Sequence, residues 1–323
     1  MKELKEIRFD SGVVILDGNR VLSPIIPRSY KDIDNDILVK GEAFIDGAVY
    51  ARQFNVEKGP VTICGALYTH NNLSANPQNT ETLHFGKAVA SGGRIELYDQ
   101  GKKYFGADVN GKHVTLKNAV VAANVFASEI TLENCVVLGG AFAGKSLKIV
   151  NSVVGTFNSP FASISGKVYI LYPSVFTVEP LKVEENASLI NLTLADWGNL
   201  MLGKPEEEYT GAIVINPEHD VQSASLQDNT KWLSYSVAGK VLTADLLDLR
   251  KLRNHFILST GALSGQLVKT YELGKTADGK DLELNLETIG DFFKGILDGT
   301  IQVSTISGTI SFEELKEHYS DDI

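Results

Sequence analysis

The sequence predicts a mainly β protein in which a three-faced β-helix is followed by a smaller α+β domain. Three observations support this prediction. A short segment recurs every 16 to 17 residues, glycine is frequent (29 of 323 residues) while methionine and tryptophan occur twice each, and the apolar periodicity changes after about residue 200. A repeat of this length is too short for a strand–helix–strand unit, but it suits one coil of a solenoid built from short strands.

The repeat is clearest between residues 106 and 154. Each of its three copies carries an apolar–polar–apolar triplet, an asparagine two residues later and, after one more residue, a pair of valines. Because equivalent positions of successive coils stack on one another, we expect the second valine of each pair in the core. These valines are Val121, Val137 and Val154.

The asparagines of the three copies are Asn118, Asn134 and Asn151. Asparagine suits the corner of a coil because it tolerates the left-handed backbone region, and its amide can bond to the asparagines above and below. We therefore expect a structural asparagine ladder and no catalytic role for these residues.

The same logic predicts the domain boundaries. We expect an N-terminal cap segment at 1–36, the β-helix at 37–200, an irregular insertion that bulges out around 71–105, and the α+β domain at 201–323. In the last region, Asp278-Gly279 is typical of a hairpin turn, and Asn285 is a candidate cap for a helix that starts near Leu286.

At these repeats, with their Gly-x-Val/Ile pattern, small residues and an apolar triplet before a turn, the sequence resembles the bactofilins, which are polymer-forming cytoskeletal β-helix proteins. The resemblance covers about half of the chain. It implies a right-handed, three-faced β-helix that polymerises end to end without a nucleotide.

Composition excludes several other classes. The formal net charge is 30 − 40 = −10 and no basic run is present, which argues against a nucleic-acid partner. No apolar stretch approaches the ~20 residues of a membrane span, and the first residues lack the apolar core of a signal peptide. Two cysteines, Cys64 and Cys135, support neither a disulfide framework nor a zinc cluster. We therefore expect a cytoplasmic protein with reduced thiols.

The sequence contains no recognisable catalytic, cofactor or metal motif. Its six histidines do not form a metal-ligand spacing, its acidic residues do not fall at equal positions in successive coils, and no glycine-rich phosphate cradle is present. We expect no enzyme activity, no cofactor and no metal.

Three functions remain open. A solenoid ends in a coil with unpaired backbone groups and an exposed core, so another element or another subunit must cover that end. The favoured function is therefore a structural, cytoskeleton-like scaffold that binds itself or another protein through the β-helix ends. The alternatives are a carbohydrate-binding or carbohydrate-active β-helix, with Tyr98, Tyr104 and Phe105 as its ligand platform, and a spacer subunit of a hetero-complex that docks its partner through the C-terminal domain.

Overall fold

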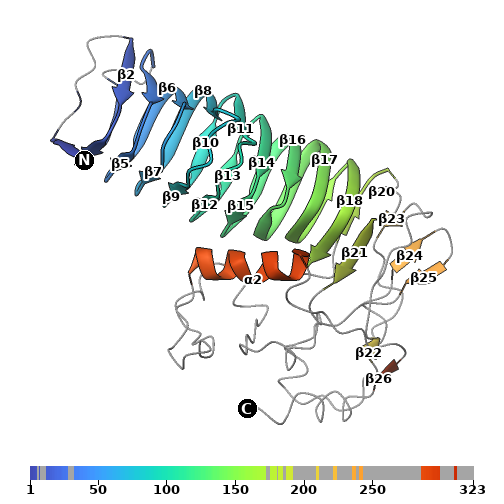
Figure 1. Cartoon of the computed structure of the whole chain (residues 1–323). Coiled ribbons are helices and arrows are strands. Elements are labelled where there is room, and N and C mark those ends of the chain that lie inside the picture. The colour runs from blue at the N-terminus through green and yellow to red at the C-terminus, as the bar shows by residue number, and fades with distance from the viewer. Residues whose placement is uncertain are drawn as a thin grey trace, which may run out of the picture. The chain divides into compact units, whose positions relative to one another are not determined.

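The protein forms a parallel β-solenoid of about nine turns in a computed structural model (Figure 1). The residues that the structure describes are 1–5, 7, 12–27, 33–171, 175–179, 181–184, 187–191, 209–210, 221–223, 235–237, 240–242, 285–298 and 309–310. These residues belong to two compact units, Met1–Val137 with Ala141–Ser146, and Leu138–Gly140 with Leu147–Ile323.

Each turn of the solenoid has three short strands, so the strands stack into three parallel faces. Face 1 contains the first part of β6 (Val49–Val56), β8 (Leu67–Ala75) and β16 (Val125–Glu133), together with β10 (Val89–Ser91), β13 (Val109–Asn110) and β19 (Val175–Thr177). Face 2 contains the last part of β6, β8 and β16, with β2 (Val13–Leu16), β4 (Asp36–Val39), β11 (Arg94–Leu97), β14 (His113–Lys117) and β20 (Lys182–Val183).

Face 3 contains β1 (Lys2–Leu4), β3 (Asn19–Val21), β5 (Ala43–Ile45), β7 (Val61–Ile63), β9 (Leu83–Phe85), β12 (Lys103–Phe105), β15 (Ala119–Val121) and β21 (Ser188–Asn191). Two long strands continue round the corners, so each contributes residues to more than one face. They are β17 (Val136–Ser159), which pairs with both β15 and β19, and β18 (Phe161–Ile170), which pairs with both β20 and β21.

Alternation within each strand builds the core, because every second side chain points into the solenoid. Phe54, Phe85 and Phe105 are among the largest fully buried side chains, and Phe85 stacks on Phe105 with ring centroids 4.8 Å apart. Burying such side chains is the main favourable contribution to folding. The core is therefore a set of columns in which equivalent residues of successive turns are in contact.

The solenoid begins earlier than the boundary at Ile37 that the sequence predicts. Strands β1, β2 and β3 pair in parallel with β3, β4 and β5 in the same ladders as the later turns. The segment expected as a cap therefore supplies the first coil. This first coil lacks the asparagine–valine motif of the later turns, so the repeat in the sequence did not reveal it.

Residues 71–105 also differ from the prediction of an irregular insertion. Strands β8 to β12 stay in the parallel ladders, with one register shift between β6 and β8, and most of the extra residues lie at the corners between faces 2 and 3. The paired residues Ile63 and Phe85 are 85 − 63 = 22 positions apart, whereas Phe105 and Val121 are 121 − 105 = 16 apart. Extra corner residues change the period of the sequence without disturbing the strands.

Most of the predicted α+β domain, including the Asp278-Gly279 turn, lies outside the described residues. The predicted helix is present as α2 (Leu286–Asp298), and Asn285 caps it by accepting a hydrogen bond from Glu287 N at 2.9 Å. Three short strands, β23 (Val221–Ser223), β24 (Tyr235–Val237) and β25 (Lys240–Leu242), form an antiparallel sheet. Strand β22 (Tyr209–Thr210) pairs with β26 (Thr309–Ile310). No helix in the described part of the chain is long and apolar enough to cross a membrane.

Candidate functional sites: the polar corner and the N-terminal edge

The corner between faces 2 and 3 carries the three asparagines of the repeat. Asn118, Asn134 and Asn151 have φ values of 52°, 51° and 43°, and Gly166 takes the equivalent place in the next turn with φ 65°. Each of these residues is in the left-handed region, which asparagine and glycine adopt more readily than other residues. One left-handed residue is enough to turn the chain from face 2 to face 3.

The asparagine amides bind the backbone of neighbouring turns. Asn118 Nδ2 donates to Gln100 O at 3.1 Å, and Asn151 Oδ1 accepts a hydrogen bond from Lys167 N at 3.0 Å. The sequence led us to expect amide-to-amide bonds, but in these two turns the partner is the main chain. A Cβ atom at Gly166 would collide with the Asn151 amide, so a larger residue there would displace that side chain from its bond to Lys167 N.

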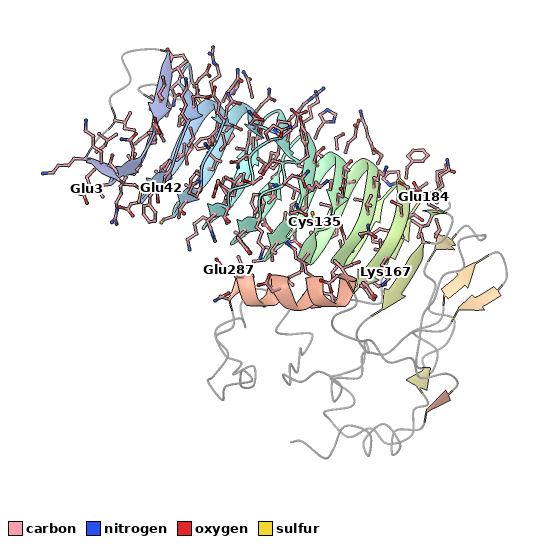
Figure 2. All side chains as sticks on the ribbon, viewed as in Figure 1. Glu3, Glu42, Cys135, Lys167, Glu184 and Glu287 are labelled. Atoms are coloured by element: carbon pink, nitrogen blue, oxygen red, sulfur yellow. The ribbon has the colours of Figure 1, made fainter. Side chains whose placement is uncertain are left out.

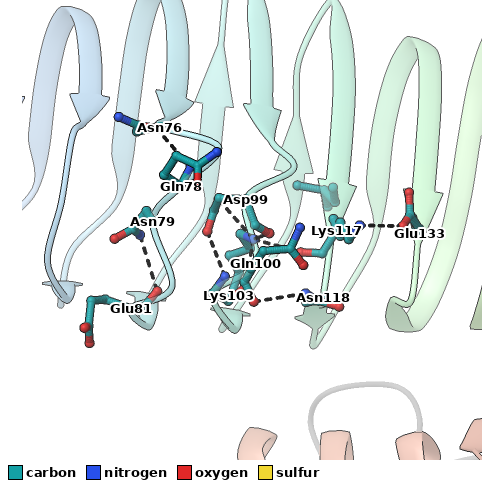
Figure 3. Close-up of polar contacts among 12 residues, drawn as sticks. Asn76, Gln78, Asn79, Glu81, Asp99, Gln100, Lys103, Lys117, Asn118 and Glu133 are labelled. Atoms are coloured by element: carbon teal, nitrogen blue, oxygen red, sulfur yellow. Dashed lines mark hydrogen bonds and ion pairs between the residues drawn. The ribbon is translucent and has the colours of Figure 1, made fainter.

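The same corner encloses a buried ion pair, Lys103 and Asp99, whose side chains are both 0% exposed. Lys103 Nζ donates to Asp99 O at 2.6 Å, to Gly101 O at 2.8 Å and to Lys117 O at 3.0 Å (Figure 3). These three carbonyls take the three protons of the ammonium group. The bond to Lys117 O links the turn of Lys103 to the next one.

The carboxylate of Asp99 balances the ammonium charge. Asp99 Oδ2 lies 3.0 Å from Lys103 Nζ and accepts no hydrogen bond from the described residues, while Asp99 Oδ1 accepts one from Gly101 N at 3.1 Å. A buried charge without a partner is very costly, so this geometry is required for either residue to be tolerated in the core.

Asn79 extends this network toward the N-terminus. Its side chain is buried, its Oδ1 accepts a hydrogen bond from Gly59 N at 3.2 Å, and its backbone O accepts one from Gly101 N at 3.2 Å. We call Asn79, Asp99, Lys103 and Asn118 the polar corner. The charged and amide groups of the polar corner are used in bonds within the protein, so its arrangement serves structure.

Sequence reasoning missed Lys103 and Asp99. Lys103 follows Lys102 in the sequence, and nothing in this pair of lysines marks Lys103 as buried. The detectable signal is the ladder position, because Lys103 pairs with Leu83 on one side and with Ala119 on the other, both of which point inward. A lysine in an apolar column indicates a buried charge.

The aromatic platform predicted from the sequence is corrected by the burial of two of its members. Tyr98 is 45% exposed, but Tyr104 is 5% exposed and Phe105 is 0% exposed. Phe105 points into the core, and Tyr104 stacks on His84 with ring centroids 4.8 Å apart. Adjacent residues of a strand point to opposite sides, so Tyr104 and Phe105 do not share an exposed surface.

The predicted core valines lie inside the solenoid. Val121, Val137 and Val154 are each 0% exposed, and Val121 pairs with Val137 on neighbouring strands. Within the described residues, no group of three histidine, cysteine or acidic side chains could hold a metal ion.

The N-terminal edge, formed by β1 and β2, is the second candidate site. Among the described strands, β2 pairs only with β4 and β1 pairs only with β3, so each leaves one edge unpaired. Gly12 O accepts a hydrogen bond from Asp36 N at 3.1 Å, and Leu16 O accepts one from Lys40 N at 2.8 Å. Because backbone groups alternate in direction along a strand, the N–H and C=O groups of the two residues at 13 and 15 point away from β4.

Side chains at this edge are also incompletely covered. Val13 is 55% exposed and Ile15 is 54% exposed, and the inward-facing Val14 is half-buried, whereas its ladder partner Ile37 is 0% exposed. Figure 2 shows Glu3, on β1, projecting from the same end of the solenoid. The edge therefore combines unpaired backbone groups with exposed apolar side chains.

These features define the chain as a parallel β-solenoid protein with a polar, internally bonded corner and an N-terminal edge that no other described strand covers. Comparisons with family models, with curated proteins and with solved structures find no significant match.

Proposed function

We propose that this protein is a structural scaffold that self-associates through the N-terminal edge of its β-solenoid. The observation that carries the proposal is the state of β2, which is paired on one side and presents Val13 and Ile15 on the other. Unpaired strand edges readily pair with another strand. Covering the exposed apolar side chains would add to the association.

The interior of the solenoid supports a scaffold rather than an enzyme. The charged groups in its core, Lys103 and Asp99, bind each other and nearby backbone carbonyls. Such a network holds neighbouring turns together but offers no free acid, base or nucleophile to a substrate. The resemblance to the bactofilins supports an assembly role, and the cytoplasmic location expected from the sequence is part of this proposal.

The carbohydrate alternative receives no support from the platform suggested for it, since Tyr104 and Phe105 are buried. A partner of another kind, as in the spacer-subunit alternative, would also use an open edge. It differs from self-association in one measurable respect, because the purified protein alone would then stay monomeric.

Sedimentation velocity of the purified full chain over a concentration series tests the proposal. We expect the average mass to rise with concentration, since an edge with exposed apolar side chains associates by mass action. The association should change little with salt, because backbone hydrogen bonds and apolar contacts are not screened as surface charges are. A mass that stays monomeric from micromolar to hundreds of micromolar protein would contradict self-association.

A further inference from the structure

We infer that the partner at the N-terminal edge is a second copy of this chain, bound through an antiparallel β2–β2 pair whose two-fold axis passes beside Val14. This inference rests on the proposed function and makes it more specific. It gives a closed dimer in place of an open polymer.

The backbone of β2 is suited to pairing with itself. Among the described residues, no strand pairs with the edge to which the N–H and C=O groups of Val13 and Ile15 point, and these two residues are placed symmetrically about Val14. In an antiparallel pair, two opposing residues that both face the partner exchange two hydrogen bonds. With the axis at Val14, Val13 lies opposite Ile15 of the partner and Ile15 lies opposite Val13 of the partner, so all free groups of this segment are used.

The side chains of β2 fit the same register. Val13 and Ile15 point to the outside of the solenoid and are more than half exposed, so each would gain an apolar neighbour directly across the strand pair. The stretch from Gly12 to Leu16 carries no charged residue, so no like charges are brought together. A β-branched pair of this kind stabilises antiparallel strands.

The contact uses the same edge in both copies, and this closes the assembly at the N-terminal end. The two β2 strands cover each other, so no third copy can add there. The last turn, whose strands β19, β20 and β21 each pair with one described strand, takes no part in this contact. Contacts between identical surfaces produce a closed two-fold dimer, whereas a head-to-tail contact would produce an open filament.

A cysteine cross-link tests the position of the axis. In the proposed register the two Val14 residues face each other as a non-hydrogen-bonded pair, about 4.5 Å apart at Cα, which is within the range for a disulfide. The variant Val14→Cys in a Cys64→Ser background should form a covalent dimer under mild oxidation. The matched control is Val178→Cys in the same background, which places a thiol on a residue 78% exposed near β19 and should remain uncross-linked.

An edge-blocking variant tests the contact without a cross-link. Ile15→Pro removes an N–H that points away from β4, so the β2–β4 ladder keeps its bonds while the dimer loses a hydrogen bond on each side. We expect the dissociation constant from sedimentation to rise by about tenfold or more. Ile15→Lys should act in the same direction, and Val178→Lys should not. Circular dichroism and a thermal melt establish that each variant is folded.

The outcomes separate the two proposals. A dimer that cross-links at Val14 and dissociates in Ile15→Pro supports both. Filaments or a continuous series of oligomers would leave the scaffold function standing and overturn the closed dimer. A dimer that neither cross-links at Val14 nor weakens in folded Ile15→Pro would overturn the β2 contact, and a monomer at all concentrations would overturn self-association itself.

Discussion

Lys103 Nζ and Asp99 Oδ2 lie 3.0 Å apart inside the solenoid, where both side chains are fully inaccessible to solvent. Replacing Lys103 with methionine would leave the Asp99 carboxylate buried without its counter-charge. We expect Lys103→Met to lower the free energy of unfolding by about 3–5 kcal/mol. Urea denaturation followed by circular dichroism measures this change.

An exposed ion pair on the same solenoid provides the control for that variant. Lys117 and Glu133 are 2.7 Å apart, but their side chains are 23% and 42% exposed. Lys117→Met should therefore cost less than about 1 kcal/mol. The double variant Lys103→Met with Asp99→Asn should recover part of the loss. Equal, small effects at Lys103 and Lys117 would show that the buried pair does not hold the corner.

Asn134 is a left-handed corner residue with φ 51°, so we expect substitutions there to differ in their effect on stability. Asn134→Gly should keep the corner, because glycine adopts this conformation without a steric penalty. Asn134→Val should lower the free energy of unfolding by at least about 1–2 kcal/mol, since a β-branched residue is disfavoured there. If valine and glycine gave the same melting temperature, the corner conformation would be wrong.

The valine column predicts a large effect of a buried charge. Val137 is 0% exposed and pairs with Val121, so Val137→Asp would bury an unpaired carboxylate and unfold the solenoid. The control is Thr131→Asp, at a half-buried position on the outer side of β16, which should remain folded. Thermal melts of the two variants give the comparison, and an unchanged melt for Val137→Asp would remove Val137 from the core.

The thiol of Cys64 predicts a pH-dependent reactivity. Partial burial of the thiol and the nearby Asp46 carboxylate raise the pKa of Cys64 above its ordinary value. The thiolate is the reactive form, so alkylation by iodoacetamide at pH 8 should be slower than for a free cysteine and should increase as the pH rises toward that pKa. Because the fold favours the neutral thiol, its contribution to stability is present at neutral pH and is lost as the pH rises through the raised value.

Cys135 provides an internal reference for the same experiment. It is fully buried, and its Sγ lies 3.4 Å from Leu116 O and 3.2 Å from Glu133 O, which are the two acceptors within reach of its thiol proton. It should react only after unfolding. Mass spectrometry of the alkylated peptides distinguishes the two residues, and a Cys64 that reacts at the rate of a free cysteine at pH 8 would contradict the raised pKa.

The solenoid could be predicted from residues that repeat for a physical reason. Asparagine recurs because a one-residue corner needs a left-handed conformation, and valine recurs because each inward position stacks on the same position of the next turn. Both requirements leave a visible period in the sequence. The start of the α2 helix was visible for a similar reason, since Asn285 caps it.

The other parts of the fold and of the candidate sites depend on features that leave no pattern in the local sequence. The first coil lacks the asparagine–valine motif, and the longer corners near Asn79 and Asp99 shift the period while the strands stay in register. The burial of Lys103 follows from its position between Leu83 and Ala119 on neighbouring strands. The local sequence, with its two adjacent lysines, does not indicate this position. Any solenoid is expected to have an uncovered strand at its end. Which strand that is depends on how the strands pair, so the sequence alone did not identify Val13 and Ile15 of β2.

Hydrogen exchange of the full chain as a function of protein concentration tests the central claim most directly. The backbone N–H groups of Val13 and Ile15 should become protected as the concentration rises, because the second copy then provides their acceptors. Protection of β4 should stay constant, since its bonds are made within one chain. If β2 exchanged at the same unprotected rate at every concentration, its edge would have no partner in this protein and association through β2 would be contradicted.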